Sequence, residues 1–255
     1  MWKITPLHVG TLDTIMCSVI MKHGVKSNPG ELTQLYHIAW LLEDDERGRK
    51  VLVDTGGDDN LERNSRLHNP IRRDEGKHVI EMLARHGVKP EQLDAIIITH
   101  LHWDHAQAIL DLPRELPVYV QREELHFALD PYPTDRKYYE ADATDQVPYY
   151  LQCYHQYKLV DGDVEIEPGL SVVHLPGHSN GSQGVVVDTK DGRFVIAGDM
   201  INIRANWEQR MPGGLYNDIK RYFDSFAKLE KLEKGGAVIL PSHDRWVLDT
   251  YPVIG

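Results

Sequence analysis

The apolar residues of this chain fall in short runs separated by polar stretches that contain glycine or proline. Short runs rich in Val, Ile and Leu predict β-strands. We expect strands over residues 3–9, 15–22, 35–43, 50–53, 95–99, 117–120, 157–160, 170–175, 184–188, 193–197 and 237–240.

Three longer segments repeat apolar residues with helical spacing. We expect helices over residues 75–86, 121–128 and 215–234. Gly87 follows the first helix, and a glycine pair follows the third, as is common at helix C-termini. The third helix carries one apolar stripe, which we expect to pack against a sheet rather than to bind a cofactor. The stripe consists of Ile219, Tyr222, Phe223, Phe226 and Leu229.

Residues 96–107 read IIITHLHWDHAQ, a β-branched run followed by four potential metal ligands within six residues. These ligands are His100, His102, Asp104 and His105. Alternate residues of an extended chain point the same way, so the first two histidines would face one side. Asp104 and His105 would offer a second set of donors nearby. Imidazole and carboxylate donors suit zinc and similar metals, and four such donors in six residues favour a metal site over scattered surface histidines.

Three more donors each follow a predicted strand. His178 comes after the strand at 170–175, Asp199 after 193–197, and His243 after 237–240. Strand ends that share one sheet edge lie close together, so these side chains can converge on the first cluster. Seven donors suit two metal ions if one carboxylate bridges them.

These motifs, together with Val53-Asp54-Thr55-Gly56, resemble the metallo-β-lactamase superfamily in order and spacing from about residue 34 to 244. The resemblance implies an α/β (α+β) fold, an αββα sandwich of two mixed sheets with helices outside and metals at one end. We expect one such domain over residues 1–255, because the sequence contains no linker-like segment and no internal repeat.

The resemblance also implies roles for individual residues. His100, His102 and His178 would bind one metal ion, and Asp104, His105 and His243 the other. Asp199 would bridge the two ions. Asp54 would orient a ligand imidazole through a hydrogen bond, although an ordinary turn after a strand is the alternative.

Within the superfamily the chain is most similar to the N-acyl-homoserine lactone lactonases, which open a lactone ring and quench bacterial quorum signals. The resemblance rests on the run YHIAWLL at 36–42 and on the 73-residue step from His105 to His178. Lactonases have an N-terminal strand pair over the metals, which residues 15–21 could supply, and they are commonly homodimers.

Two departures from the lactonase pattern concern substrate specificity. Ala106-Gln107-Ala108 stands where lactonases have Ala-Gly-Gly, so the helix start after the motif is expected to differ. Asn202 stands where they carry a tyrosine, and its amide could donate a hydrogen bond to a developing oxyanion. Tyr36 or Tyr216 could contact the substrate instead. The sequence therefore allows two kinds of substrate, an N-acyl homoserine lactone or another small lactone.

The predicted mechanism needs no serine or cysteine nucleophile. Two divalent ions lower the pKa of a shared water toward roughly 7, and the bridging hydroxide would attack the carbonyl carbon. Asp104 would pass a proton to the leaving alkoxide. Zinc suits the donors best, although iron, manganese and cobalt accept the same ligands. Ser242 is expected to be a turn residue.

Composition narrows the partners and the compartment. With 39 acidic and 28 basic residues among 255, the formal charge is −11 and no basic stripe is present. This charge argues against a nucleic-acid partner and favours a small-molecule substrate. Cys17 and Cys153 are too few for a disulfide framework, and the chain has neither a signal peptide pattern nor an 18-residue apolar run. We therefore expect a cytoplasmic protein without membrane insertion.

Two segments are expected to decide substrate choice, residues 57–74 and residues 130–157. The second contains seven of the 12 tyrosines. Packing onto the body or a dimer contact is the favoured explanation for these tyrosines, and a pocket wall is the alternative.

Other functions fit the sequence less well. A hydrolase of a different small ester, thioester or cyclic amide shares the same ligand set, but glyoxalase II-type thioesterases add a C-terminal helical domain and only 12 residues follow His243. Flavodiiron-type reductases would place a glutamate at position 102. A non-catalytic metal-binding scaffold predicts missing ligands, yet all seven are present.

Overall fold

The computed structural model describes residues 1–26, 28–60, 62, 71–73, 76–143 and 146–255. Its centre consists of two β-sheets. The seven-stranded sheet has the order β4-β1-β2-β3-β5-β6-β7, and the five-stranded sheet has the order β12-β11-β10-β9-β8. The strands of the larger sheet are β1 (Lys3–Ile15), β2 (Leu32–Asp44), β3 (Arg49–Val53), β4 (Ile71–Arg72), β5 (Ala95–Ile97), β6 (Val118–Gln121) and β7 (Tyr157–Val160). Those of the smaller sheet are β8 (Val164–Glu167), β9 (Leu170–His174), β10 (Gln183–Thr189), β11 (Gly192–Ile196) and β12 (Val238–Leu240).

Both sheets are mixed. In the larger sheet β1, β2 and β3 pair antiparallel, whereas β3, β5, β6 and β7 run parallel. In the smaller sheet only β11 and β12 are parallel. Parallel strands end at the same edge, so the loops that follow β3 and β5, and those that follow β11 and β12, lie together.

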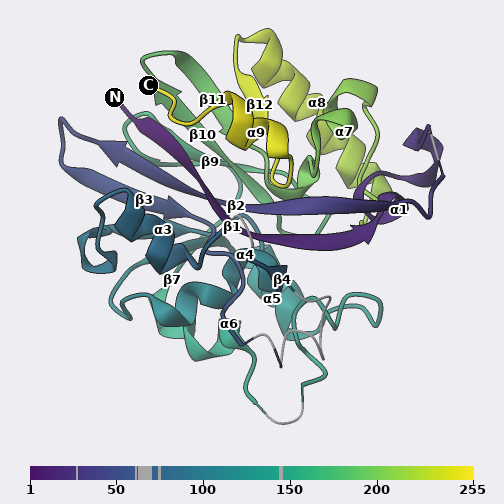
Figure 1. The fold of residues 1–255 in the computed structure, drawn as a ribbon, viewed down its shortest axis with the longest axis horizontal. Helices are drawn as coiled ribbons and strands as arrows, with labels where there is room; N and C mark the ends of the chain where they lie inside the picture. Colours follow the sequence, from purple (N-terminus) through teal and green to yellow (C-terminus); the bar gives the residue numbers. More distant parts are fainter. Residues whose placement is uncertain (27, 61, 63–70, 74–75, 144–145) are drawn as a thin grey trace.

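Helices cover the outer faces of the two sheets (Figure 1). The helices of the described residues are α1 (Met16–Val19), which lies at the far end of the β1–β2 pair, α3 (Val79–Arg85), α4 (Trp103–Ala106), α5 (Arg122–Leu129), α6 (Tyr149–Gln152), α7 (Arg204–Gln209), α8 (Ile219–Lys234) and α9 (Arg245–Thr250), which packs into the cluster between the sheets. Short 3-10 turns lie at Lys22–Gly24, Pro90–Gln92, Gln107–Asp111, Tyr154–Gln156 and Gly198–Met200.

Three apolar clusters separate these layers. One lies between the sheets and includes Trp40, Val53 and Ile196. A second lies under α8 on the outer face of the smaller sheet, and a third under α3, α5 and α6 on the larger sheet. Burial of apolar surface on both faces of each sheet stabilises this four-layer arrangement. The predicted αββα sandwich of two mixed sheets is confirmed.

The N-terminal prediction was wrong in detail. The predicted strand at 3–9 is part of a longer strand, β1, which ends at Ile15 and pairs with β2 over nearly its full length, whereas no strand forms over most of 15–22. Residues 16–19, which are apolar enough to suggest a strand, instead form α1. The expected N-terminal strand pair is therefore formed by β1 and β2 and not by residues 15–21.

The third predicted helix is α8, which begins at Ile219 rather than at 215. The side chain of Asp218 accepts hydrogen bonds from the backbone N–H groups of Lys220 and Arg221, which fixes this start. Of the predicted stripe, Tyr222, Phe226 and Leu229 pack on the smaller sheet as expected. Ile219 and Phe223 are exposed.

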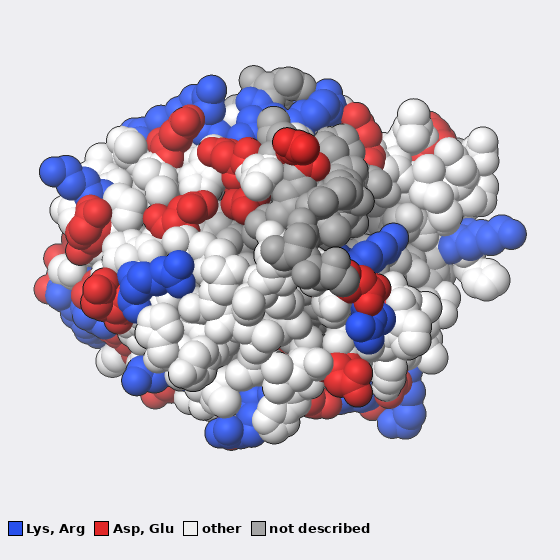
Figure 2. Space-filling view, turned by 90° about the horizontal axis from the view of Figure 1, so that it is seen from below, with Lys and Arg blue, Asp and Glu red and all other residues white. Residues whose placement is uncertain are grey.

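The outer surface carries charges of both signs. On the face shown in Figure 2, lysine and arginine are interspersed with aspartate and glutamate. None of the helices in the described part of the chain is long and apolar enough to cross a membrane.

Candidate metal centre

The seven predicted ligands converge at one edge of the sandwich. Four of them come from the segment directly after β5, and the other three follow β9, β11 and β12. These loops meet because the C-terminal ends of the strands share that edge, as the sequence predicted. All seven side chains are buried or nearly so.

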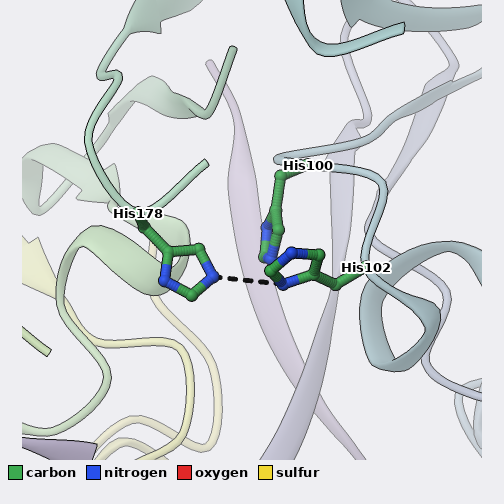
Figure 3. Close-up of side chains that lie close together, drawn as sticks. All are labelled: His100, His102 and His178. Atoms are coloured by element: carbon green, nitrogen blue, oxygen red, sulfur yellow. Dashed lines mark hydrogen bonds between the residues drawn. The ribbon is translucent and has the colours of Figure 1, made fainter. Parts of the chain in front are cut away.

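His100, His102 and His178 form the first cluster, with their rings directed toward one another (Figure 3). The Nε2 atom of His178 lies 3.2 Å from Nδ1 of His102. The backbone fixes the His178 ring, because its Nδ1 lies 3.0 Å from the carbonyl oxygen of Leu215. The hydroxyl group of Thr99 lies 3.2 Å from Nδ1 of His100. One imidazole nitrogen from each ring is thus directed to a common point.

Asp104, His105 and His243 lie beside the first cluster. Oδ2 of Asp104 is 3.8 Å from Nε2 of both histidines. Asp199 lies between the two clusters: its Oδ1 is 3.0 Å from Nε2 of His105 and of His243, and its Oδ2 is 3.6 Å from Nε2 of His178. The Asp199 carboxylate therefore spans the two clusters, as a bridging ligand would.

Partners behind the ligands hold them in place. Oδ2 of Asp54 accepts a hydrogen bond from Nδ1 of His105 at 2.8 Å, and Thr99 donates to the same carboxylate through its N–H and its hydroxyl group. The carbonyl oxygen of Tyr36 lies 3.1 Å from Nδ1 of His243. Ser242, expected to be only a turn residue, donates to Oδ1 of Asp199 at 2.8 Å. Such bonds fix the tautomer and the orientation of a metal ligand.

A buried carboxylate outside the predicted set joins the two loops that carry the first cluster. Glu124, at the start of α5, is completely buried. Its Oε1 accepts hydrogen bonds from Leu101 N and from the Tyr139 hydroxyl group, and its Oε2 accepts from Ser179 Oγ and Gly181 N. Sequence reasoning missed Glu124, because a glutamate in the first turn of a helix carries no signal of burial.

The electrostatics of the centre follow from close packing of charges. Burial alone would raise the pKa of Asp199, but His243 and His105 hold it well below its usual range. Burial alone would lower the pKa of His105, but the carboxylates of Asp199, Asp104 and Asp54 raise it well above the usual value. The pKa of His243 is also raised, mainly by Asp199 against the effect of burial. The carboxylates of the centre therefore favour protonation of these two rings, and the rings in turn favour ionisation of Asp199.

The centre fits a metal pair. The Nε2 atoms of His100, His105 and His243 are buried without a well-formed hydrogen bond among the described residues, although Oδ1 of Asp199 lies 3.0 Å from the Nε2 atoms of His105 and His243. Buried polar atoms normally form hydrogen bonds, so three imidazole nitrogens that gather around two carboxylates without well-formed hydrogen bonds indicate that a cation completes the site. The donor set of five imidazoles and two carboxylates suits zinc and related ions.

One further potential donor lies at the centre and was missed. His37 on β2 lies with Asp104 and His243 in a group whose ligand atoms are all within 4.8 Å of one another. Burial lowers the pKa of His37 to about 3, so its ring is neutral at neutral pH. Its position within an apolar strand, far from the predicted ligands in sequence, gave no sign that it lies there.

A cavity of about 320 Å³ opens onto the centre. Its walls combine ligands, aliphatic side chains and a few polar groups: Leu12, Thr14, Ser18, Leu35, His102, Trp103, Asp104, Lys137, Tyr138, His178, Asp199, Asn202 and Leu215. The ends of β1 and β2 thus reach over the cavity.

Of the three residues predicted to contact the substrate, one lines the cavity and two do not. Asn202 lines the cavity, and its Nδ2 donates to the carbonyl oxygen of Val19 at 3.0 Å. Tyr36 and Tyr216 do not line it; the hydroxyl group of Tyr36 instead donates to Gln34, and Tyr216 is exposed. The structure therefore brings Asn202 to the site but neither of these two tyrosines.

The tyrosine-rich segment mainly packs against the body. Tyr139, Tyr149 and Tyr150 are buried in the cluster below α5, in agreement with the favoured explanation. Tyr138 is the member that lines the cavity. Burial, with contributions from Asp135 and Asp104, raises the pKa of Tyr138 to about 12, so its hydroxyl group keeps its proton. The other expected specificity segment, residues 57–74, lies largely outside the described residues.

The departure after the His-Asp motif has a structural consequence. The chain continues from α4 into a 3-10 turn, and the side chain of Gln107 is completely buried. It accepts a hydrogen bond from Asp58 N and donates one to Glu140. The Gln107 side chain thus links the segment after β3 to the segment that contains Glu140.

Comparison with known proteins assigns the class. The sequence profile of the Metallo-beta-lactamase superfamily matches residues 32–243, so the chain belongs to this superfamily. The chain is 30% identical over 229 residues to the N-acyl homoserine lactonase of Bacillus thuringiensis, and this alignment covers 85% of this chain and 84% of the relative. It is 32% identical over 199 residues to an N-acyl homoserine lactonase of a Bacillus species, with 72% and 71% covered.

Solved structures agree. An N-acyl homoserine lactone hydrolase with the product N-hexanoyl-L-homoserine bound at its catalytic metal center matches with a TM-score of 0.80 and 25% identity, covering 99% of this chain and 98% of that chain. The resemblance to lactonases that the sequence motifs indicated is confirmed. These relatives are named as lactonases or hydrolases of N-acyl homoserine lactones.

Proposed function

We propose that this chain hydrolyses the ester bond of a lactone, either an N-acyl homoserine lactone or another small lactone, at a pair of divalent metal ions. The observation that carries the proposal is the position of Asp199, whose two carboxylate oxygens face the two donor clusters below the cavity. The names of the relatives supply the reaction class.

We propose zinc as the metal, because imidazole and carboxylate donors suit it. When bound, a metal pair would polarise the lactone carbonyl group and lower the pKa of a water molecule. His100, His102 and His178 would hold one ion, and Asp104, His105 and His243 the other, with Asp199 between them.

The chain's own residues would handle the proton and the substrate. Asp104 lines the cavity, where its carboxylate could receive a proton from the water and deliver it to the leaving alkoxide. Asn202 uses one amide hydrogen for Val19, which leaves the second for the developing oxyanion. The Tyr138 hydroxyl group, which stays protonated, is a further donor at the cavity wall.

The cavity supports a small substrate. Leu12, Leu35 and Leu215 provide apolar wall beside the polar centre, an arrangement suited to a ring with a polar ester edge. We propose a small-molecule substrate and no nucleic-acid partner. A homodimer stays a prediction. Cys17 and Cys153 are both free, which supports a cytoplasmic location.

A substrate panel tests the proposal. Zinc-loaded protein is assayed against lactones of different ring size and acyl chain, thioesters, cyclic amides and phosphodiesters, beside the Asp199→Ala variant. We expect lactone hydrolysis that falls at least about 100-fold in the variant, since loss of the shared ligand disrupts both ion positions. Cleavage of phosphodiesters without any lactone hydrolysis, or undiminished turnover by Asp199→Ala, would overturn it.

A further inference from the structure

His37 occupies an unusual place for a histidine. It lies on β2 between Tyr36 and Ile38, and because the β1–β2 pairing shifts between His8 and Gly10, it pairs with Gly10. Its side chain is 1% exposed. The ring lies against that of His243, with 5.2 Å between centroids, and edge-on to Trp103 at 5.9 Å. It is therefore part of the wall of the metal centre.

Both ring nitrogens of His37 lack a hydrogen-bond partner in the part of the chain that the structure describes. The nearest carboxylate oxygen, Oδ2 of Asp104, is 3.7 Å from Nε2, which is too far for a hydrogen bond. Leaving a buried polar group unpaired is destabilising, and a valine or leucine at this position would avoid that cost. A role in packing alone does not explain a histidine here.

The distances fit a shared metal ion. With metal–ligand bonds of about 2.1 Å, two donors on one ion lie at most about 4.2 Å apart. The Asp104 oxygen lies 3.7 Å from Nε2 of His37 and 3.8 Å from Nε2 of His243. We propose that His37 is a further ligand of the ion position formed by Asp104 and His243, and that it binds through Nε2.

This inference rests on the metal pair of the proposed function and makes that pair unequal. Without His37, each position has four protein donors, Asp199 being shared. With His37, the position of Asp104 and His243 has five. The two ions should therefore differ in affinity, and the difference should depend on His37.

The test compares metal binding by wild type, His37→Val and His243→Val, measured as zinc content and by competition with a chelator. Wild type should bind two equivalents. His37→Val should bind one of them at least about 10-fold more weakly and the other within about threefold of wild type. His243→Val, which removes a predicted ligand of the same position, should weaken the same equivalent. Ile38→Val, a buried change on the opposite face of β2, should leave both affinities unchanged.

Two further readouts separate a ligand from a structural residue. In cobalt-loaded wild type, six histidine rings should give paramagnetically shifted NMR signals, and one set should vanish in His37→Val. Without metal, His37→Val should melt at or above the temperature of wild type, because it removes two unpaired buried nitrogens. Added zinc should raise its melting temperature by less than in wild type. If His37→Val does not fold, His37→Gln should show the same loss of affinity.

Unchanged affinity for both equivalents in His37→Val, or only five shifted rings in wild type, would overturn the role of His37 and leave the proposed function intact. Fewer than two equivalents bound by wild type would overturn both.

Discussion

Replacing Glu124 by glutamine tests whether one buried carboxylate holds the loops of the first histidine cluster. Glu124 accepts four hydrogen bonds, two at each oxygen. Three come from the segments that follow His100 and His178, and the fourth comes from the hydroxyl group of Tyr139. Glutamine has nearly the same shape, but its NH₂ group must replace one acceptor. The hydroxyl groups of Ser179 and Tyr139 can rotate and accept, whereas the backbone N–H of Gly181 or Leu101 cannot.

The cost follows from this count. One buried N–H group left unpaired costs about 1–3 kcal/mol, and loss of charge weakens the remaining bonds by roughly another 1 kcal/mol. We therefore expect Glu124→Gln to lower the free energy of unfolding by about 2–4 kcal/mol. For a chain of this size the melting temperature should fall by roughly 4–16 °C. Urea denaturation and calorimetry of the metal-free protein measure both quantities.

The neighbouring residue provides a matched control. Glu123 lies in the same turn of α5 but is partly exposed, where it pairs with Arg221. Glu123→Gln should cost less than about 1 kcal/mol, because exposed ion pairs contribute little. If the two variants lose equal stability, or if Glu124→Gln melts within about 2 °C of wild type, the account of this buried network is incorrect.

Three other predictions concern the centre. In Asp54→Asn, the amide oxygen must accept the hydrogen bond from Thr99 N–H, so the NH₂ group would face Nδ1 of His105. Zinc affinity should therefore fall about 10–100-fold, and an unchanged dissociation constant for zinc would contradict this. The raised pKa values of His105 and His243 mean that zinc must displace protons from these rings. Zinc affinity should therefore rise with pH, by up to about tenfold per pH unit for each proton released. Calorimetry in buffers of different ionisation enthalpy measures the proton release, and the absence of any release would contradict this prediction. Gly177 has a φ of +142°, and in Gly177→Ala the new Cβ would lie 2.5 Å from Cα of Tyr222. The free energy of unfolding, measured by urea denaturation, should therefore fall by roughly 1–3 kcal/mol. An unfolding midpoint equal to that of wild type would refute this prediction.

The sequence predicted the parts of the site that depend on strand ends. His178, Asp199 and His243 each follow an apolar run, and parallel strands place such residues at one edge, so their convergence could be expected from pattern alone. The motif at 100–105 could also be predicted, because its four ligands lie within six consecutive residues.

The remaining features depend on tertiary packing. His37 and Glu124 each sit in ordinary secondary structure, and only the folded chain shows that both are buried at the centre. The run at 15–22 is apolar in sequence, yet the pairing of β1 with β2 ends at Ile15 and residues 16–19 form α1. The hydroxyl group of Tyr36 donates to Gln34, whereas the backbone carbonyl oxygen of Tyr36 lies 3.1 Å from Nδ1 of His243. A contact made by the backbone cannot be predicted from the pattern of side chains.

Metal titration of activity tests the central claim most directly. Protein freed of metal with a chelator is supplied with zinc in steps, and lactone hydrolysis is measured beside bound zinc. The account predicts negligible hydrolysis without metal and a rise that saturates at two equivalents. Full activity in the metal-free protein, or saturation below two equivalents, would contradict it.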